Sequence, residues 1–369
     1  MIERLEPQSV VRGVLHVIVA YDWGDEVDLA RAASLASGRR LDLERRPRTP
    51  TSVAYRPTPL NFSRGTTATT LPDMPPCAAA VSATVFDFAA INLRLDVPLE
   101  STVAGLRRLA GDPAALQALV RSARDAAESL HRELLPAIKA PAWRDFSEEY
   151  FVFHFDPATL PDPQRLVERH ADWLAALLRL ENDPLSRDEI DDALSRRLSY
   201  APHDLVLVDW AAAVVIDREC EESLRAIEFA NVQLLEFRHL DRRLDDALIE
   251  AYGLIHSLAG SRRPLFGRSQ HGPLRVLGDI KIETDVLFER SANALKLVGD
   301  QYLARLYRQL AHRFHLDEWA SGIRQSLDVV ESVYRILADQ AAAGRIELME
   351  LIVIGLIAVE IVISLTADH

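Results

Sequence analysis

The chain has 369 residues, a net charge of −13 at neutral pH and an apolar fraction of 49%. This length allows two or more domains, and the composition is that of a globular protein rather than a disordered one. The acidic balance argues against a dedicated nucleic-acid-binding protein, which would carry clustered Lys and Arg. Two widely separated cysteines, Cys77 and Cys220, predict neither a disulfide scaffold nor a metal-binding framework, and they fit a reducing compartment.

The first half of the sequence alternates β-rich runs with helical stretches. The β-rich runs cover residues 13–20, 52–57, 83–98 and 148–156. The helical stretches cover residues 29–36, 102–138 and 161–183, and the second of them has a predicted break at Gly111-Asp112-Pro113. Residues 205–210 and 213–217 are again β-rich, and their short link predicts a hairpin or a bent strand. We therefore predict a mixed α/β domain over residues 1–217.

Residues 218–347 change to an almost wholly helical pattern. Apolar side chains recur there at spacings near three and four, which is the period of one helix face. The last stripe has spacings of 4, 4, 3, 4 and 3, which suit a coiled-coil seam: Trp319, Ile323, Leu327, Val330, Tyr334 and Leu337. We predict a helical, coiled-coil-like region that self-associates, and packing within a single chain is the alternative.

The segment from Leu348 to Leu365 is the most apolar part of the chain. Its Leu, Ile and Val residues favour insertion into a bilayer by about 5 kcal/mol, and an off-centre Glu360 offsets part of that. Arginines precede the segment and none follows it, so the positive-inside rule leaves the large domain in the cytoplasm. We predict a single-pass tail anchor in the cell inner membrane, with Glu350, Gly355 and Glu360 as candidate membrane or helix-contact residues. A soluble oligomer with this helix buried is the alternative.

No established catalytic motif occurs in the sequence. It lacks a dinucleotide-binding glycine loop, a Walker lysine loop, a Gly-x-Ser-x-Gly elbow and a His-Glu-x-x-His helix. The prediction is therefore no enzyme, no cofactor, and no catalytic or metal residues. An enzyme with a site in the first domain is the alternative, built from polar residues at strand ends: His154, His203, Asp204 and Asp209.

Three charged clusters allow a weaker functional interpretation. His312 and His315 lie one helical turn apart near Asp317 and Glu318, a spacing that can serve a metal, although packing or solvated histidines explain it better. Residues 188–192 hold four carboxylates suited to a hard cation, but Ser186 and Glu189 are better explained as the capped start of a helix. An arginine cluster could contact phosphates, but it has no interleaved aromatic residues and is better explained as a solvated loop: Arg39, Arg40, Arg45, Arg46 and Arg48.

The order of these parts resembles the family named for its requirement in meiotic nuclear division, also called the YagE or regulator-of-microtubule-dynamics family. The resemblance rests on "LVLVDWAAAVVID", on "FANVQLLEFRHLD" and on the ending "LMELIVIGLIAVEIVISL". It implies an α+β fold with a C-terminal transmembrane helix, and the absence of a targeting presequence fits a bacterial-type member.

The function expected from the sequence is that of a membrane-anchored, cytoplasm-facing scaffold or organising protein. Its expected partners are the lipid bilayer, a second copy of the chain through its helices, and a protein or ribonucleoprotein, with no strong nucleic-acid signal of its own. The alternatives are the enzyme and the soluble oligomer described above.

Overall fold

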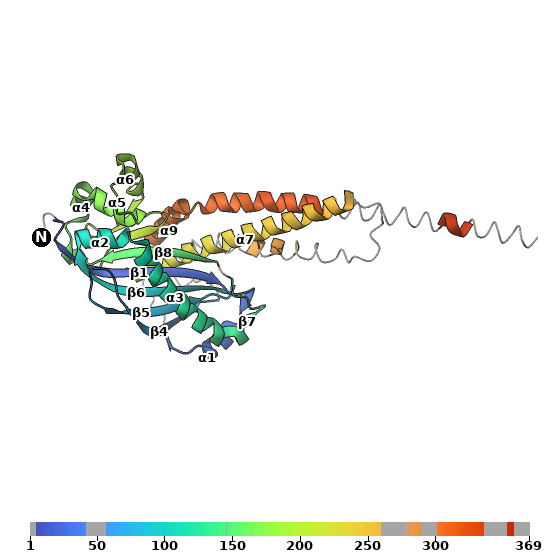
Figure 1. The fold of residues 1–369 in the computed structure, drawn as a ribbon, viewed down its shortest axis with the longest axis horizontal. Helices are drawn as coiled ribbons and strands as arrows, with labels where there is room; N and C mark the ends of the chain where they lie inside the picture. The colour runs from blue at the N-terminus through green and yellow to red at the C-terminus, as the bar shows by residue number, and fades with distance from the viewer. Residues whose placement is uncertain are drawn as a thin grey trace, which may run out of the picture. The chain divides into compact units, whose positions relative to one another are not determined.

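A computed structural model of the protein describes residues 5–41, 57–144, 146–259, part of 278–288, 301–335 and 353–357. The chain divides into two compact units. The first combines Met1–Glu236 with Glu289–Asp317, and the second combines Phe237–Phe288 with Glu318–His369. The fold is therefore mixed α+β, with a large N-terminal sheet domain and helices in the C-terminal part (Figure 1).

The first unit is built on a nine-stranded sheet in the described part of the chain. Its order is β3-β4-β5-β6-β1-β8-β11-β10-β9, and every neighbouring pair is antiparallel except β8 with β11. The strands are β1 (Val10–Asp22), β3 (Arg39–Arg40), β4 (Leu60–Thr69), β5 (Cys77–Val85), β6 (Ala90–Thr102), β8 (Ser147–Phe155), β9 (Arg197–Leu198), β10 (Leu205–Val208) and β11 (Ala212–Ile216). A separate pair joins β2 (Glu26–Val27) to β7 (Ile138–Lys139).

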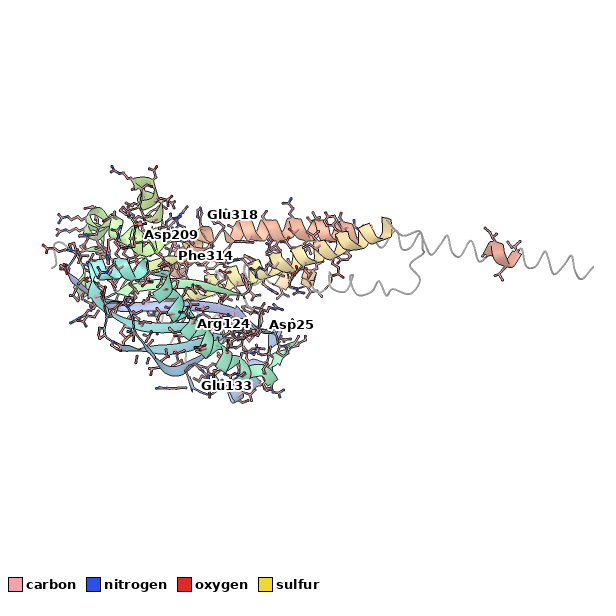
Figure 2. The ribbon with its side chains drawn as sticks, viewed as in Figure 1. Asp25, Arg124, Glu133, Asp209, Phe314 and Glu318 are labelled. Carbon is pink, nitrogen blue, oxygen red and sulfur yellow. The ribbon has the colours of Figure 1, made fainter. Side chains whose placement is uncertain are left out.

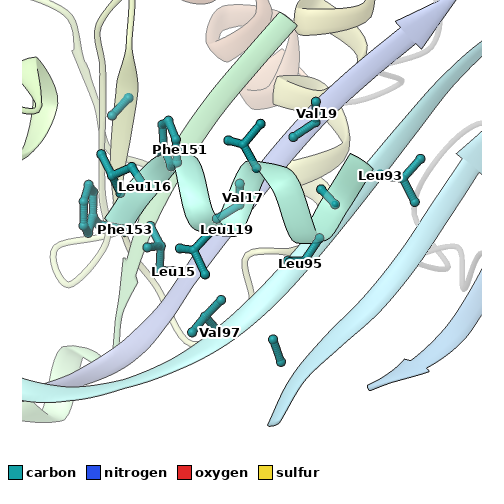
Figure 3. Packing of buried hydrophobic residues seen from close by; sticks show 14 of the residues in the cluster. Leu15, Val17, Val19, Leu93, Leu95, Val97, Leu116, Leu119, Phe151 and Phe153 are labelled. Carbon is teal, nitrogen blue, oxygen red and sulfur yellow. The ribbon is translucent and has the colours of Figure 1, made fainter. Parts of the chain in front are cut away.

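One face of this sheet is apolar and carries the main core. Side chains alternate between the two faces of a strand, so Leu15, Val17 and Val19 of β1 point to the same side as Phe151 and Phe153 of β8. Helix α3 (Pro113–Leu134) lies across this face and contributes Leu116 and Leu119 (Figure 3). Further core residues come from α1 (Leu29–Leu35), α2 (Val103–Ala110), α4 (Pro163–Arg169) and α5 (Ala171–Arg179).

The opposite face carries polar side chains and is covered by other helices. The first residues of α7 (Glu221–Ala259) lie against it, because Asn231 donates to the carbonyl of Glu148 at 3.0 Å. Helix α9 (Gln301–Arg313) joins this layer, where the Tyr307 hydroxyl donates to the Gln233 side chain. This face is where functional side chains gather, because the polar residues of β1 and β6 point to it.

The local signals in the sequence are confirmed by several elements. The break at Gly111 to Pro113 separates α2 from α3, and the Asp112 carboxylate caps α3 by accepting from the amides of Ala114 and Ala115. Strands β10 and β11 form the predicted hairpin. Helix α6 (Arg187–Ala193) begins at Ser186, whose hydroxyl accepts from the Glu189 amide. The described part of this unit also contains two short 3-10 helices, Leu135–Ala137 and Pro157–Thr159. The β-rich run at 52–57 lies outside the described residues except for its last position.

The second unit is helical in its described residues. The described part of the predicted stripe packs inside the same chain, because Ile323 and Val330 are buried, and the neighbouring Arg324 lies over the ring of Phe288 at 4.0 Å. Leu337 lies outside the described residues. Lys281 pairs with Glu331 at 3.3 Å. These contacts support the alternative of packing within one chain for this stripe, and self-association stays a prediction.

The predicted membrane anchor requires a correction. Among the residues described, no helix combines the length and the apolar character needed to span a bilayer. The physical reason is length, because a span needs about 20 largely apolar residues, whereas the uninterrupted apolar run is confined to Leu351–Val359 between two glutamates. The transmembrane helix at 348–365 and the single-pass inner-membrane location were therefore wrong predictions.

The candidate residues of that segment have different outcomes. Residues 353–357 are helical and exposed, and a Cβ added at Gly355 would meet nothing within 4 Å. Glu350 and Glu360 lie outside the described residues. Their role as contact residues stays a prediction.

Candidate metal centre

Three side chains with metal-binding donor atoms converge on the polar face of the sheet. They are His16 of β1, His154 of β8 and Cys220, the residue before α7. The Cys220 Sγ lies 3.3 Å from Nδ1 of His154 and 3.9 Å from Nε2 of His16. All three donor atoms lie within 4.8 Å of one another. His16 and Cys220 are buried, whereas His154 is half-buried.

The register of β1 and β8 brings the two histidines together. His154 stands opposite Val14 on β1, so His16 lies two residues further along the same face, in the diagonal position. The two imidazole rings stack with centroids 5.6 Å apart. A glycine allows β8 to come close here, since a Cβ at Gly13 would collide with the carbonyl oxygen of His154. The histidine pair is therefore a consequence of sheet pairing rather than of local sequence.

Cys220 reaches the same place because β11 runs beside β8. Strand β11 is parallel to β8 and ends at Ile216, so the chain leaves the sheet next to the end of β8 that carries His154. The carbonyl of Cys220 accepts the Leu224 amide at 2.8 Å, which places Cys220 at the N-cap of α7. The thiol is thereby held at the point where strand and helix meet.

Hydrogen bonds determine which nitrogen of each ring faces the thiol. Nδ1 of His16 lies 2.7 Å from the Asp96 carboxylate, and Nε2 of His154 lies 2.9 Å from the carbonyl oxygen of Asp217. Both partners are acceptors, so each of these nitrogens carries the proton. In the neutral rings, the remaining nitrogens, Nε2 of His16 and Nδ1 of His154, present lone pairs toward Cys220. This is the neutral form in which histidine ligates metals.

With both rings neutral, the Cys220 thiol can donate to only one of them. One S–H proton can bond to one imidazole lone pair, whereas two lone pairs face Sγ. In a tetrahedral zinc site with bonds of about 2.3 Å to sulfur and 2.0–2.1 Å to nitrogen, sulfur and nitrogen stand roughly 3.6 Å apart. The observed separations of 3.3 and 3.9 Å fall on either side of that value. The donors are thus spaced for one ion to be bound by all three.

A network of charged side chains holds Asp96, the hydrogen-bond partner of His16. The Asp96 oxygen that accepts from His16 also lies 3.0 Å from Nε of Arg94. The Arg94 guanidinium in turn contacts Glu221 at 3.1 Å and Glu228 at 3.0 Å, both on α7. Arg94 and Glu228 are buried, at 9% and 5% exposed, whereas Glu221 and Asp96 are partly exposed. Burial by itself would raise the pKa of Asp96, but the hydrogen bond from His16 and the charge of Arg94 outweigh it and the pKa is lowered.

Burial also sets the protonation of the other groups in the cluster. It raises the pKa of the Cys220 thiol to about 12, with a further contribution from the nearby Glu221 charge. It lowers the pKa of His154, which keeps this imidazole neutral. It raises the pKa of Glu228 although Arg94 acts in the opposite direction. A metal ion bound at Cys220 would therefore have to displace the thiol proton.

Four residues were proposed from the sequence for an enzyme site, and only His154 belongs to the cluster. The other three lie elsewhere. The Asp204 carboxylate accepts from the amides of Tyr200 and Ala201 in a turn, and His203 is exposed. The Asp209 carboxylate is fully buried, with Arg179 Nε at 2.7 Å and Arg313 Nε at 3.4 Å.

Several residues of the charged clusters considered as cation or phosphate sites form contacts within the protein. Nε2 of His312 lies 2.9 Å from the Arg196 guanidinium, and His315 has a φ of 53° in the turn after α9. In α6, Asp192 pairs with Arg179 and Arg313. Arg39 and Arg40 form the exposed strand β3, and the remaining arginines of that cluster lie outside the described residues.

Sequence reasoning did not single out His16, Asp96 or Cys220. One signal was present, because His16 and His154 are each the single histidine in an otherwise apolar strand, "GVLHVIVA" and "YFVFHF". A polar ring in such a run has to find a partner on the buried face. The spacing to Cys220 carries no motif, because the three residues lie on three separate elements.

Comparison with known proteins identifies the domain that holds this cluster. A family model described as the N-terminal domain of the uncharacterised protein MJ0711 matches residues 12–222. The chain belongs to this family. The match begins just before His16 and ends just after Cys220, so all three donor residues lie within it.

The chain is also similar to an archaeal protein over much of its length. The uncharacterised protein MJ0711 of Methanocaldococcus jannaschii is 24% identical over 249 residues, which cover 64% of this chain and 72% of that protein. No solved structure shows significant similarity to the chain. The resemblance to the meiotic nuclear division family is therefore corrected: the matching family is a different one, and the relative is archaeal rather than bacterial.

Proposed function

We propose that the N-terminal domain is a metal-binding module that holds one Zn²⁺ ion through His16 Nε2, His154 Nδ1 and Cys220 Sγ. The observation that carries this proposal is that one nitrogen of each imidazole ring faces the same thiol. The other nitrogen of each ring contacts a hydrogen-bond acceptor, which fixes the orientation of the ring. A ligand histidine whose outer N–H donates to a carboxylate or a carbonyl is the usual arrangement at zinc sites.

The donor set favours zinc over other common ions. Two imidazole nitrogens and one thiolate suit a borderline-soft ion, whereas Ca²⁺ and Mg²⁺ take oxygen ligands. Copper also accepts two histidines and a cysteine, usually with a distant axial methionine. Among the described methionines, Met74 lies between β4 and β5 and packs against the apolar core, which is on the other face of the sheet. The described part of the chain thus favours zinc.

The formal charges around the cluster favour a dication. Asp96, Glu221 and Glu228 contribute three negative charges, and Arg94 and Arg225 two positive charges, which leaves one negative charge. A Cys220 thiolate increases the excess to two. A dication neutralises this excess, while Cu⁺ would leave one negative charge, and charge left uncompensated in the protein interior is costly.

The test is the metal content of the full-length protein. After purification without chelator, elemental analysis should find one zinc per chain. Replacement of zinc by Co²⁺ should produce the near-ultraviolet absorption of a sulfur-to-cobalt transition, because one of the ligands is a thiolate. Cys220→Ser should abolish that absorption, and His16→Gln should weaken metal binding at least tenfold.

Two matched variants serve as controls. Cys77→Ser removes the other cysteine, and His203→Gln removes an exposed histidine away from the cluster. Both should keep one zinc per chain and the cobalt absorption. A wild-type protein without stoichiometric zinc that also fails to bind added Zn²⁺ or Co²⁺ would refute the proposal. The organising role expected from the helical stripes remains a separate prediction.

A further inference from the structure

We infer that the metal centre has an exchangeable fourth position that accepts a small monodentate ligand, water or an inorganic anion. This inference rests on the proposed zinc site. Zinc in proteins is almost always four-coordinate. In the described part of the chain, the convergent group of His, Cys, Asp and Glu donors around this point has three members, one donor atom each. Four protein ligands are typical of structural zinc, while three plus a solvent molecule are typical of reactive zinc.

The neighbouring carboxylates are already engaged by other groups. Asp96 accepts from His16 and pairs with Arg94. Both oxygens of Glu221 contact the same Arg94 guanidinium, at 3.2 and 3.1 Å. Glu228 is held by Arg94 on the buried side. To ligate the metal, Glu221, which uses both oxygens, would have to give up a contact with a buried guanidinium, which is costly for the group that remains.

The loop before Cys220 is engaged in the same way. The Asp217 carboxylate accepts from the backbone amides of Arg218 at 2.6 Å and Glu219 at 3.4 Å, and its carbonyl accepts from His154. These bonds shape the loop that delivers Cys220. The side chain of Asp217 is thus bound to its own loop rather than directed to the cluster.

Side chains that border the cluster are partly exposed to solvent. Cys220 and His16 are buried, but the Glu221 side chain next to the thiol is 53% exposed and the Asp96 side chain is 27% exposed. His154 is half-buried. We therefore place the entry of a small ligand on the side of Glu221 and Asp96. A site closed by protein on all sides would show buried carboxylates here.

The experiment uses the full-length protein loaded with Co²⁺ and titrates it with sodium azide, then with thiocyanate, at constant ionic strength. The visible d–d bands of Co²⁺ report its coordination sphere, and the near-ultraviolet sulfur transition reports that Cys220 stays bound. We expect the d–d bands to shift with saturation for both anions while the sulfur transition remains. Sodium perchlorate at the same concentration, a poor ligand, should cause no shift.

The Glu221→Gln variant distinguishes an open site from one closed by that carboxylate. We expect wild type and variant to respond to azide with affinities within threefold of each other. A silent wild type with a responsive variant would overturn the inference, because Glu221 would then be the fourth ligand. Silence in both proteins, with Co²⁺ and the sulfur transition present, would also overturn it and leave the metal site intact. Failure to bind Co²⁺ at all would instead refute the proposed function.

Discussion

At the scale of single residues, the candidate centre depends on hydrogen bonds behind the donors as much as on the donors themselves. Asp96 orients His16, Arg94 orients Asp96, and the carbonyl of Asp217 orients His154. Loss of such an outer partner typically lowers metal affinity by about 10–100-fold. The strength of the site is therefore determined by groups that never touch the ion.

Asp96→Ala should lower zinc affinity by about 10–100-fold, because it removes the acceptor that fixes the ring and proton of His16. Asp96→Asn should cost less, since an amide oxygen still accepts from Nδ1. Competition with a chromophoric chelator measures both. Asp73→Asn is the control: it neutralises an exposed carboxylate paired with Arg108, and Asn tolerates the φ of 57° at this position. Equal affinities for wild type and Asp96→Ala would contradict the role of Asp96.

A second residue-scale prediction concerns stability at low pH. Glu133 on α3 forms a two-point contact with Arg64, at 2.6 and 2.9 Å, and accepts from the amide and hydroxyl of Ser37. The hydrogen bond from Arg64, reinforced by Ser37, lowers the pKa of Glu133 to about 2. The folded state thus favours the carboxylate, so its contribution is complete above the ordinary pKa near 4.5 and declines as pH falls toward 2.

Glu133→Gln should therefore destabilise the protein by about 1–3 kcal/mol at pH 7, a range reduced to allow for solvent screening. The difference from wild type should shrink as the pH is lowered below about 4.5. Urea unfolding at several pH values provides the measurement. Glu128→Gln, at an exposed i,i+4 pair on the same helix, should change stability by less than about 0.5 kcal/mol at any pH. A difference that stays constant to pH 3 would exclude this linkage.

At the scale of elements, α3 shows how the capped start of a helix is related to its packing on the apolar face of the sheet. Pro113 in the first turn suits a helix start, and the Asp112 carboxylate satisfies two free amides. The helix buries Leu116, Leu119 and Val120 against the sheet (Figure 3). A correct start of the helix sets the rotation at which these side chains meet the strands.

Asp112→Ala should lower the free energy of unfolding by about 1 kcal/mol, because the amides of Ala114 and Ala115 lose their acceptor. Guanidinium unfolding monitored by circular dichroism tests this. Asp125→Ala removes an exposed carboxylate from the middle of the same helix and should stay within about 0.5 kcal/mol of wild type. Equal stabilities of Asp112→Ala and Asp125→Ala would show that the cap has no energetic role.

At the scale of the whole molecule, the first unit is assembled from segments far apart in the chain. Residues 301–317 return to it after an excursion through the second unit. Their attachment includes Arg313, which pairs with Asp209 at 3.4 Å and with Asp192 at 3.0 Å, and Phe314, which packs edge-on against Tyr150. Asp209 and Phe314 are labelled in Figure 2. The Nε–H bonds of Arg179 and Arg313 do not point at the Asp209 carboxylate, so these contacts are ion pairs rather than hydrogen bonds. Burial raises the pKa of Asp209 despite both arginines.

Asp209→Ala should destabilise the protein by about 3 kcal/mol, because Arg179 and Arg313 lose a buried carboxylate partner. Both arginines still pair with Asp192, which limits the loss. Hydrogen exchange should accelerate in α9 before it does in β1 or β6, because α9 loses a direct attachment. Glu100→Ala breaks an exposed pair with Arg12 and should cost less than about 1 kcal/mol. Unchanged exchange in α9 would show that Asp209 does not hold this segment.

Local features of this protein followed from the sequence because their causes are local. The break at Gly111 to Pro113, the Ser186 cap, the hairpin after Leu205 and the buried stripe through Ile323 each depend on residues within a few positions of one another. The predicted tail anchor was wrong because hydropathy alone suggested a span for a segment with only a short uninterrupted apolar run. The long helix α7 was predictable from the period of its apolar residues. The face of the sheet on which its first turns lie was not predictable in this way.

The sequence by itself determined the α+β class, the approximate positions of β1, β8, α1 and α3, and the helical character of residues after Cys220, but not strand β4. Only the tertiary structure decided that Cys220 meets His154, 66 residues away, and His16, 204 residues away. Strand order and register are set by packing among distant segments, and no spacing along the chain encodes them. A centre made of one residue from each of three elements therefore becomes visible only after the sheet has been assembled.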